Sequence, residues 1–183
     1  MGFWDFFRKK KRADQGPSMV DLALDDLVAG CMVDYDLKTW EVTARHVTDW
    51  GGGDKSIEWQ LKSYDDVIYL EKTEDDEVEW CISRKADLRL LGPDVPQKII
   101  ETDDPPETVT CEGLSYYLEE SGGGHFYKNG TGEGLPMLMW DYEDDSGRRY
   151  LTIEQWGEEE FELYLGEPVE SYQFTNILPP HSS

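Results

Sequence analysis

The chain has 183 residues, a formal net charge of -23 at pH 7, 38% hydrophobic residues and seven tryptophans. This apolar and aromatic content supports a packed core in one or two domains and excludes a chain that stays unfolded for lack of hydrophobic side chains. The negative charge argues against nucleic acid as a partner, because affinity for a phosphate backbone comes largely from Lys and Arg, and it favours cations or basic partners.

Residues 1–18 differ from the rest of the chain and predict a basic, aromatic tail with a linker. On a short helix, three of its apolar side chains share one face, and five basic residues against Asp5 give residues 1–12 a local charge of +4. We expect this tail to contact an anionic membrane surface. The alternatives are docking on the acidic body, docking in a groove of a partner, or disorder in isolation. The residues expected to touch the membrane are Phe3, Trp4, Phe6, Phe7, Arg8, Lys9, Lys10, Lys11 and Arg12.

Residues 19–92 predict a first β repeat that begins with a short helix. Ser18 and Asp21 have a spacing like that of a capping box, and the apolar residues that follow keep a helical spacing up to Gly30. Beyond Gly30 the pattern changes to strands. The alternation of Trp40, Val42 and Ala44 with polar residues predicts that these three side chains share one face. The strands expected here are residues 31–35, 40–47, 56–61, 67–71 and 78–82, with a short closing strand at 88–90.

Residues 93–107 contain four prolines and predict a connector, because proline cannot donate to a sheet ladder. Residues 108–178 then repeat the strand pattern, with an insertion between His125 and Pro136 and a last strand at 169–174. The matched positions of the two repeats are Trp59 with Trp140, Tyr69-Leu70 with Tyr150-Leu151, Trp80 with Phe161, and Gly51–Gly53 with Gly122–Gly124.

This internal similarity predicts an all-β fold. We expect a duplicated antiparallel β-meander, packed as a sandwich or as two small docked barrels, with a short N-terminal helical tail. Residues 31–91 should superpose on residues 108–166 strand for strand, with the matched aromatic side chains pointing inward.

The three cysteines have no CxxC spacing and the three histidines are far apart in the chain. This pattern favours a reducing compartment such as the cytoplasm, without disulfides. It shows no spacing of zinc ligands, so we predict no metal site and no cofactor.

Glycine triplets and acidic runs fall in the predicted turns. Neither Gly51–Gly53 nor Gly122–Gly124 leads into a helix, so hairpin loops are favoured over phosphate-binding loops. Most of the adjacent Asp and Glu residues are expected to be solvated side chains that favour the turn conformation. Two acidic runs occupy matching turns of the repeats and could form one rim that holds a polyamine or a divalent cation. The residues of this rim are Asp75, Asp76, Glu158, Glu159 and Glu160.

Most aromatic residues are expected to lie in the core or to pair across strands. The better candidates for a ligand or partner surface lie beside the glycine triplets; they are Trp50, His125, Phe126 and Tyr127. No GxSxG elbow and no local signature of a catalytic cysteine is present, so we predict that the protein is not an enzyme.

The pattern resembles a bacterial family of domains of unknown function, numbered 4178, over roughly residues 20–178. The stretches that carry the resemblance are Leu27-Val28-Ala29-Gly30, Val33-Asp34-Tyr35, Trp40-Glu41-Val42, Gly51–Gly53, Trp59-Gln60-Leu61, Tyr69-Leu70 and Tyr150–Gly157. Members of that family are associated with systems that also encode phage-shock-protein-A-like membrane-remodelling coat proteins and polyamine-synthesis-like proteins. The resemblance therefore implies a non-enzymatic accessory role in a membrane-stress or envelope-maintenance system, and it implies no catalytic residues.

Three functional hypotheses follow. The leading one is a cytoplasmic adaptor, peripheral at the inner membrane face, which docks through its tail and recruits a protein partner such as a phage-shock-protein-A-like coat protein through its β body. The second is a module that binds a polyamine or another cation on its acidic rim. The third is an enzyme of unknown reaction.

Overall fold

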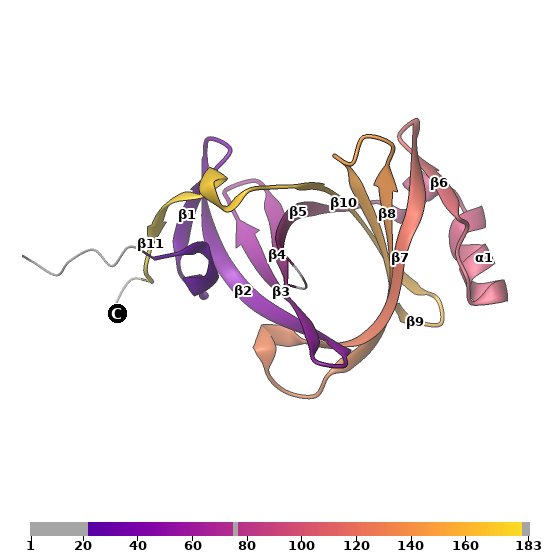
Figure 1. Cartoon of the computed structure of the whole chain (residues 1–183), viewed down its shortest axis with the longest axis horizontal. Coiled ribbons are helices and arrows are strands. Elements are labelled where there is room, and N and C mark those ends of the chain that lie inside the picture. Colours follow the sequence, from indigo (N-terminus) through magenta and orange to yellow (C-terminus); the bar gives the residue numbers. More distant parts are fainter. Residues whose placement is uncertain (1–21, 75–76, 181–183) are drawn as a thin grey trace, which may run out of the picture.

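The computed structural model describes residues 22–74 and 77–180, and β-strands dominate them (Figure 1), which confirms the predicted all-β class. The strands are β1 (Met32–Tyr35), β2 (Lys38–Gly51), β3 (Asp54–Lys62), β4 (Val67–Glu74), β5 (Val78–Ala86), β6 (Thr108–Cys111), β7 (Leu114–Tyr127), β8 (Leu135–Asp144), β9 (Tyr150–Gly157), β10 (Glu160–Pro168) and β11 (Thr175–Leu178). The helical segments are α1 (Asp94–Thr102) and the short 3-10 segments η1 (Leu24–Asp26), η2 (Leu88–Leu91), η3 (Lys128–Gly130) and η4 (Ser171–Gln173). Among the residues described, no helix is long and apolar enough to cross a membrane.

The strands pair antiparallel in one sheet, in the order β11-β1-β2-β3-β4-β5-β10-β9-β8-β7-β6. A further pairing of β2 with β7 joins the eight strands from β2 round to β7 into a ring. We call this junction the seam; its residue pairs are Val47 with Tyr127, Thr48 with Phe126, and Asp49 with His125. In Figure 1 the two strands meet at the bottom of the ring. The expected sandwich or pair of separate small barrels is therefore wrong, because one continuous sheet curls back on itself.

A β-bulge in β2 decides which side chains face the inside of the ring, which we call the lumen. Val42 lies opposite Leu61, whereas Ala44 lies opposite Gln60, so the register shifts between them. Val42 and Leu61 belong to an apolar core, and Ala44 and Gln60 line the lumen. The prediction that Trp40, Val42 and Ala44 share one face is therefore wrong at Ala44, since the extra residue of a bulge turns the strand over.

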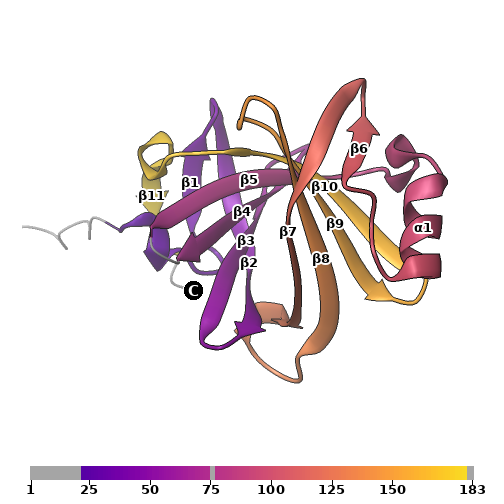
Figure 2. The same ribbon diagram turned by 45° about the vertical axis from the view of Figure 1, so that its right-hand side comes forward.

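The apolar side chains form two core clusters, and C-terminal residues such as Val169 and Phe174 return to join the first. The first lies at the end of the molecule that carries β1 and β11, and the second lies at the end that carries β6 and α1 (Figures 1 and 2). Trp59 is fully buried in the first cluster, where its Nε1 donates to the carbonyl oxygen of Leu27 at 2.8 Å. Trp140 is 5% exposed and belongs to the second cluster. The lumen between the two clusters is left to polar and aromatic side chains.

Three predicted segments have a different structure. The connector 93–107 contains α1, in which Pro96 lies in the first turn, where the missing N–H breaks no helical hydrogen bond. Val95 and Ile99 of this helix are buried in the second core cluster, which explains why the segment folds as a helix. Residues 88–90 lie in η2, and residues 169–174 contain η4 while the last strand is β11. The short helix expected before Gly30 is reduced to η1, and the tail lies outside the described residues.

Gly122–Gly124 lie inside β7 and not in a turn, which corrects the predicted hairpin loop. The reason is the seam, where Trp50 of β2 packs on these glycines. A Cβ atom on Gly124 would lie 2.7 Å from Cε3 of Trp50 and 2.9 Å from the carbonyl oxygen of Asp49. Trp50 is held in place because its Nε1 donates to Oγ of Ser56 at 3.2 Å. The glycines therefore allow β7 to approach β2 closely enough to close the ring.

We expect the substitution Gly124→Ala to destabilise the protein by roughly 1–3 kcal/mol, because the new methyl group overlaps an indole ring and a backbone oxygen that cannot both move away. The matched control is Gly122→Ala, whose Cβ would meet Trp50 only at an ordinary 3.6 Å. Chemical denaturation of both variants measures the difference. Equal stability of the two would show that the seam has room for a side chain.

Candidate functional site

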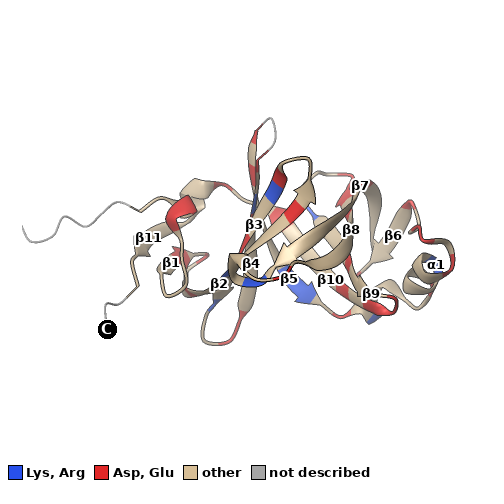
Figure 3. Cartoon of the chain, turned by 90° about the horizontal axis from the view of Figure 1, so that it is seen from below, with Lys and Arg blue, Asp and Glu red and all other residues tan. Residues whose placement is uncertain are grey.

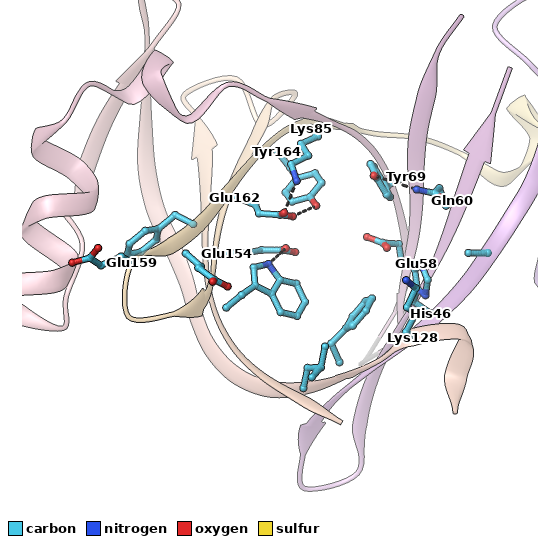
Figure 4. Close-up of a pocket in the computed structure, with 16 residues that line it drawn as sticks. His46, Glu58, Gln60, Tyr69, Lys85, Lys128, Glu154, Glu159, Glu162 and Tyr164 are labelled. Carbon is cyan, nitrogen blue, oxygen red and sulfur yellow. Dashed lines mark hydrogen bonds and ion pairs between the residues drawn. The ribbon is translucent and has the colours of Figure 1, made fainter. Parts of the chain in front are cut away.

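A cavity of about 750 Å³ opens at one mouth of the lumen, and we call it the first cavity (Figure 4). Inward-facing residues of β2, β3, β4, β5, β9 and β10 supply most of its wall, because side chains alternate between the two faces of each strand. Its lining residues are Ala44, His46, Glu58, Gln60, Tyr69, Lys85, Phe126, Lys128, Leu135, Glu154, Trp156, Glu159, Glu160, Phe161, Glu162 and Tyr164.

A second cavity of about 550 Å³ lies against the same ring strands. It contains eight carboxyl side chains, and its wall includes no Lys, Arg or His. Its acidic residues are Glu71, Glu77, Glu79, Glu119, Glu120, Asp141, Glu143 and Glu170. Asp and Glu are spread over the rest of the described body as well (Figure 3), but only here do so many line one hollow.

Four carboxyl side chains lie between the two cavities, and we call them the carboxyl belt: Glu58, Glu71, Asp141 and Glu154. The pairing of β3 with β4 places Glu58 directly opposite Glu71. Residues opposite each other in antiparallel strands have Cβ atoms about 4.5–5.5 Å apart, so like charges there repel. Glu58 lines the first cavity and Glu71 lines the second, so the two cavities meet at this pair.

The belt raises the pKa of its own members. Burial, followed by the charges of Glu71, Glu154 and Glu162, raises the pKa of Glu58 well above its usual value. Burial, followed by the charges of Glu71 and Glu162, raises the pKa of Glu154 to about 8. Burial also raises the pKa of Asp141 to about 7, against the hydrogen bond from Thr152. At neutral pH the belt therefore holds protons that ordinary carboxyl groups would have lost.

Most carboxylates around the first cavity have a hydrogen-bond or ion-pair partner within the protein. Glu162 forms an ion pair with Lys85 and accepts a hydrogen bond from the Tyr164 hydroxyl at 2.7 Å. Glu154 accepts from Nε1 of Trp156 at 3.2 Å. Glu58 differs, because the described residues give it no hydrogen bond and no ion pair, and its part-buried side chain opens onto the first cavity. Figure 4 shows Glu58 and Glu154 pointing toward one another across the cavity.

Aromatic rings complete the wall of the first cavity. Phe126 contacts Trp156 edge to face with ring centroids 5.2 Å apart, and Tyr69 contacts Tyr164 in the same way at 5.4 Å. The ring of His46 lies 4.9 Å from that of Phe126. The His46 Nδ1 accepts from the backbone N–H of Asn129 at 3.0 Å, and burial, followed by the charge of Lys128, lowers the pKa of this histidine. An aromatic face beside a carboxylate is a common environment for an ammonium group.

The residues expected to form a ligand or partner surface lie together at the seam, but they do not share one hollow. They are Trp50, His125, Phe126 and Tyr127, and Phe126 is the one among them that lines the first cavity. Tyr127 lines a hollow on the outer wall of the ring.

Part of the predicted acidic rim does face the lumen. Glu159 and Glu160 line the mouth of the first cavity, and Glu158 is exposed beside them. Asp75 and Asp76 lie outside the described residues, as does the whole predicted membrane-contact segment.

The carboxyl belt was missed at the sequence level, although a signal for it exists. Glu58 lies between Ser56 and Gln60 in a period of two, and Glu154 lies between Thr152 and Trp156 in the same way. Such alternation marks a polar face of a strand, which is usually a face toward solvent. Only the closure of the ring turns this polar face into the wall of a cavity.

A metal centre finds no support in the described part of the chain, where no three His, Cys, Asp or Glu side chains converge as metal ligands do. Cys31, Cys81 and Cys111 are free thiols. Cys81 lies beside the belt, where burial and then the charge of Glu71 raise the pKa of its thiol, so it is a poor nucleophile. In the described residues the lumen therefore combines negative charge with aromatic surface.

Comparisons with known proteins identify a family but no function. An uncharacterized protein of Aquifex aeolicus (strain VF5) is 29% identical over 182 residues, which cover 98% of this chain and 99% of that protein. No solved structure matches. The family model of a domain of unknown function, DUF4178, matches residues 28–171, a span that includes every strand from β1 to β10. The chain therefore belongs to the DUF4178 family.

Proposed function

We propose that the protein is a non-enzymatic binding module that holds a cationic ligand inside its strand ring. The observation that carries this proposal is Glu58, a part-buried carboxyl group without a protein partner that faces Glu154 across the first cavity. Two carboxyl groups that face one another in a hollow repel each other when both are ionised, and a bound cation offsets that repulsion. The sequence also suggested a polyamine or another cation as ligand, as its second hypothesis. The proposed binding site is now the lumen and not the outer acidic rim.

The first test compares cations by thermal melting. Spermidine at ten to a hundred times its dissociation constant is expected to raise the melting temperature by about 3–8 °C more than sodium chloride of equal ionic strength. The variant Glu58→Gln/Glu154→Gln should lose this difference, whereas the control Glu41→Gln/Glu107→Gln, which changes two exposed carboxylates, should keep it. An equal response of the unmodified protein to both salts would reduce the effect to general screening.

We propose as a second function the adaptor role that the sequence favours, in the cytoplasm at the inner membrane face, with a phage-shock-protein-A-like coat protein as a possible partner. What supports it is the composition of the tail, in which apolar side chains precede five basic residues. Each cation near an anionic leaflet contributes on the order of 1 kcal/mol. The body carries the opposite charge, so binding should depend on the tail alone.

Co-sedimentation with vesicles that contain anionic lipid tests the tail. We expect the full chain to bind in a salt-sensitive way, whereas a chain that starts at Ser18 and a variant with alanine at Phe3, Trp4, Phe6 and Phe7 should remain in solution. Equal sedimentation of all three chains would remove the tail from membrane binding and leave docking on the acidic body or on a partner as its role.

We also infer that the ring arose by duplication of one five-strand unit. Strands β1 to β5 have 4, 14, 9, 8 and 9 residues, and β6 to β10 have 4, 14, 10, 8 and 9. The bulge between Val42 and Ala44 of β2 has a counterpart between Leu118 and Glu120 of β7. The match of Tyr69-Leu70 with Tyr150-Leu151 shifts by two residues, because Trp59 lies opposite Leu70 whereas Trp140 lies opposite Ile153. Under this register Ile153, and not Leu151, corresponds to Leu70. The match of Gly51–Gly53 with Gly122–Gly124 shifts as well, because alignment of the two bulges places Gly51 at the position of Tyr127.

A further inference from the structure

We propose that the ligand of the lumen is a linear polyamine whose ammonium groups occupy both cavities at once, with the carboxyl belt between them. This inference rests on the proposed function and names the class of cation that the ring selects. It assigns a second half of the site, the second cavity, which neither the sequence nor the comparisons indicated.

The first argument is that the two cavities use corresponding positions of the two halves. Glu71 and Thr73 follow Leu70 on β4 and line the second cavity, as Glu154 and Trp156 follow Ile153 on β9 and line the first. The same holds on neighbouring strands, where Cys81 and Ser83 of β5 take the places that Glu162 and Tyr164 take on β10. Among these positions the shared group is a carboxyl, Glu71 in one cavity and Glu154 in the other, so a ligand with an ammonium group at each end finds an acidic partner in both.

The second argument is the distribution of negative charge. The carboxyl groups do not converge on one point, as the ligands of a metal ion do, but extend from Glu159 and Glu160 at one mouth, through the belt, to the eight carboxyl groups of the second cavity. Positive charges that neutralise this row must be spread along a line. A chain of ammonium groups joined by short alkyl segments has this form, whereas a single ion does not.

The third argument concerns the surfaces between the carboxyl groups. The Phe126–Trp156 and Tyr69–Tyr164 ring pairs lie among Glu58, Glu154 and Glu162 in the first cavity. Aromatic faces suit the alkyl segments of a polyamine and attract its nitrogens as well. Carboxylates accept the N–H donors of primary and secondary ammonium groups, and a quaternary ammonium ion would leave them without a donor.

Isothermal titration of the full chain tests this inference with butylamine, putrescine, spermidine and spermine at pH 8.5. We expect affinity to rise at least tenfold from the monoamine to the tetraamine, with one tetraamine bound per chain. The variant Glu71→Gln/Asp141→Asn, which neutralises the second-cavity side of the belt, should reduce spermine affinity at least tenfold and reduce butylamine affinity by a clearly smaller factor. Gln and Asn keep the shape of the protonated acids, and cooperative melting of the variant verifies its fold.

The possible outcomes separate this inference from the proposed function. Equal affinity for butylamine and spermine would overturn the inference and leave a cation site in the first cavity. Tighter binding of magnesium than of spermine would assign the site to a metal ion, and tighter binding of tetralysine would assign it to a basic peptide; each would also overturn the inference. If none of these probes binds, both the inference and the proposed function are contradicted. A chain that starts at Ser18 serves as a control for competition by the basic tail.

Discussion

Alanine in place of Trp59 or Trp140 is expected to lower the free energy of unfolding by about 3–5 kcal/mol, as deletion of a large buried aromatic side chain usually does. The two tryptophans are 0% and 5% exposed, and each belongs to a different core cluster. Trp59 should be the more costly of the two, because its loss also leaves the carbonyl of Leu27 without the indole donor. Urea denaturation followed by circular dichroism measures both losses.

The matched control for these substitutions is Trp156→Ala. This tryptophan is only half-buried and faces the lumen, so its removal opens no closed cavity in a core and should cost less than half as much. A loss at Trp156 as large as that at Trp59 would contradict the placement of the two cores outside the lumen. If the alanine variants do not fold, the milder Trp59→Phe and Trp140→Phe changes should show the same order.

The protein is expected to be most stable near pH 5 and to lose about 2–3 kcal/mol of its free energy of unfolding between pH 5 and pH 8.5. The carboxyl groups of Glu154 and Asp141 have pKa values raised to about 8 and about 7 in the folded protein. The folded chain therefore binds more protons than the unfolded chain between pH 4 and pH 8, so stability falls as the pH rises through this window. At about 1.4 kcal/mol per pKa unit, Glu154 alone would account for roughly 5 kcal/mol, and the partial solvent exposure of this side chain reduces that figure.

The substitution Glu154→Gln isolates this effect, because glutamine resembles the protonated acid at every pH. We expect the variant to melt at a higher temperature than the unmodified protein at pH 8.5 and at a similar temperature at pH 5. Below pH 4 both should lose stability, since Asp87 and Asp66 have lowered pKa values through their hydrogen bonds with Arg89 and Arg84. A melting temperature that stays constant from pH 5 to pH 8.5 would contradict the raised pKa of the belt.

The strands were predictable because their signals are local. Period-two alternation and turn residues place most strands of both halves. The face of Ala44 was not predictable, because a bulge is set by the pairing with β3 and leaves no mark in the spacing of β2. The role of Gly124 was missed for a similar reason, since the ring of Trp50 that excludes a side chain there comes from a strand about 70 residues away.

The candidate site was largely hidden because it depends on closure. Glu58, Glu71 and Asp141 are ordinary polar strand residues until β2 pairs with β7 and turns the inner face of the sheet into a lumen. Their pKa values follow from this enclosure and from one another, and neither can be read from single positions. Phe126 was selected for its place beside a glycine triplet and does line the lumen, although the triplet is not the loop that suggested it.

The inferred duplication has a consequence for how the ring is held together. At the junction of β5 and β10 the central pair is Arg84 with Leu165, and at the seam Asp49 pairs with His125. Each of these pairs joins equivalent positions of the two repeats, so a pseudo-twofold axis passes through both junctions. Such contacts are isologous, as in the interface of a C2 homodimer. On this inference, two copies of a half-length chain would close the same ring as a dimer, with β11 and α1 lying outside the repeated five-strand unit.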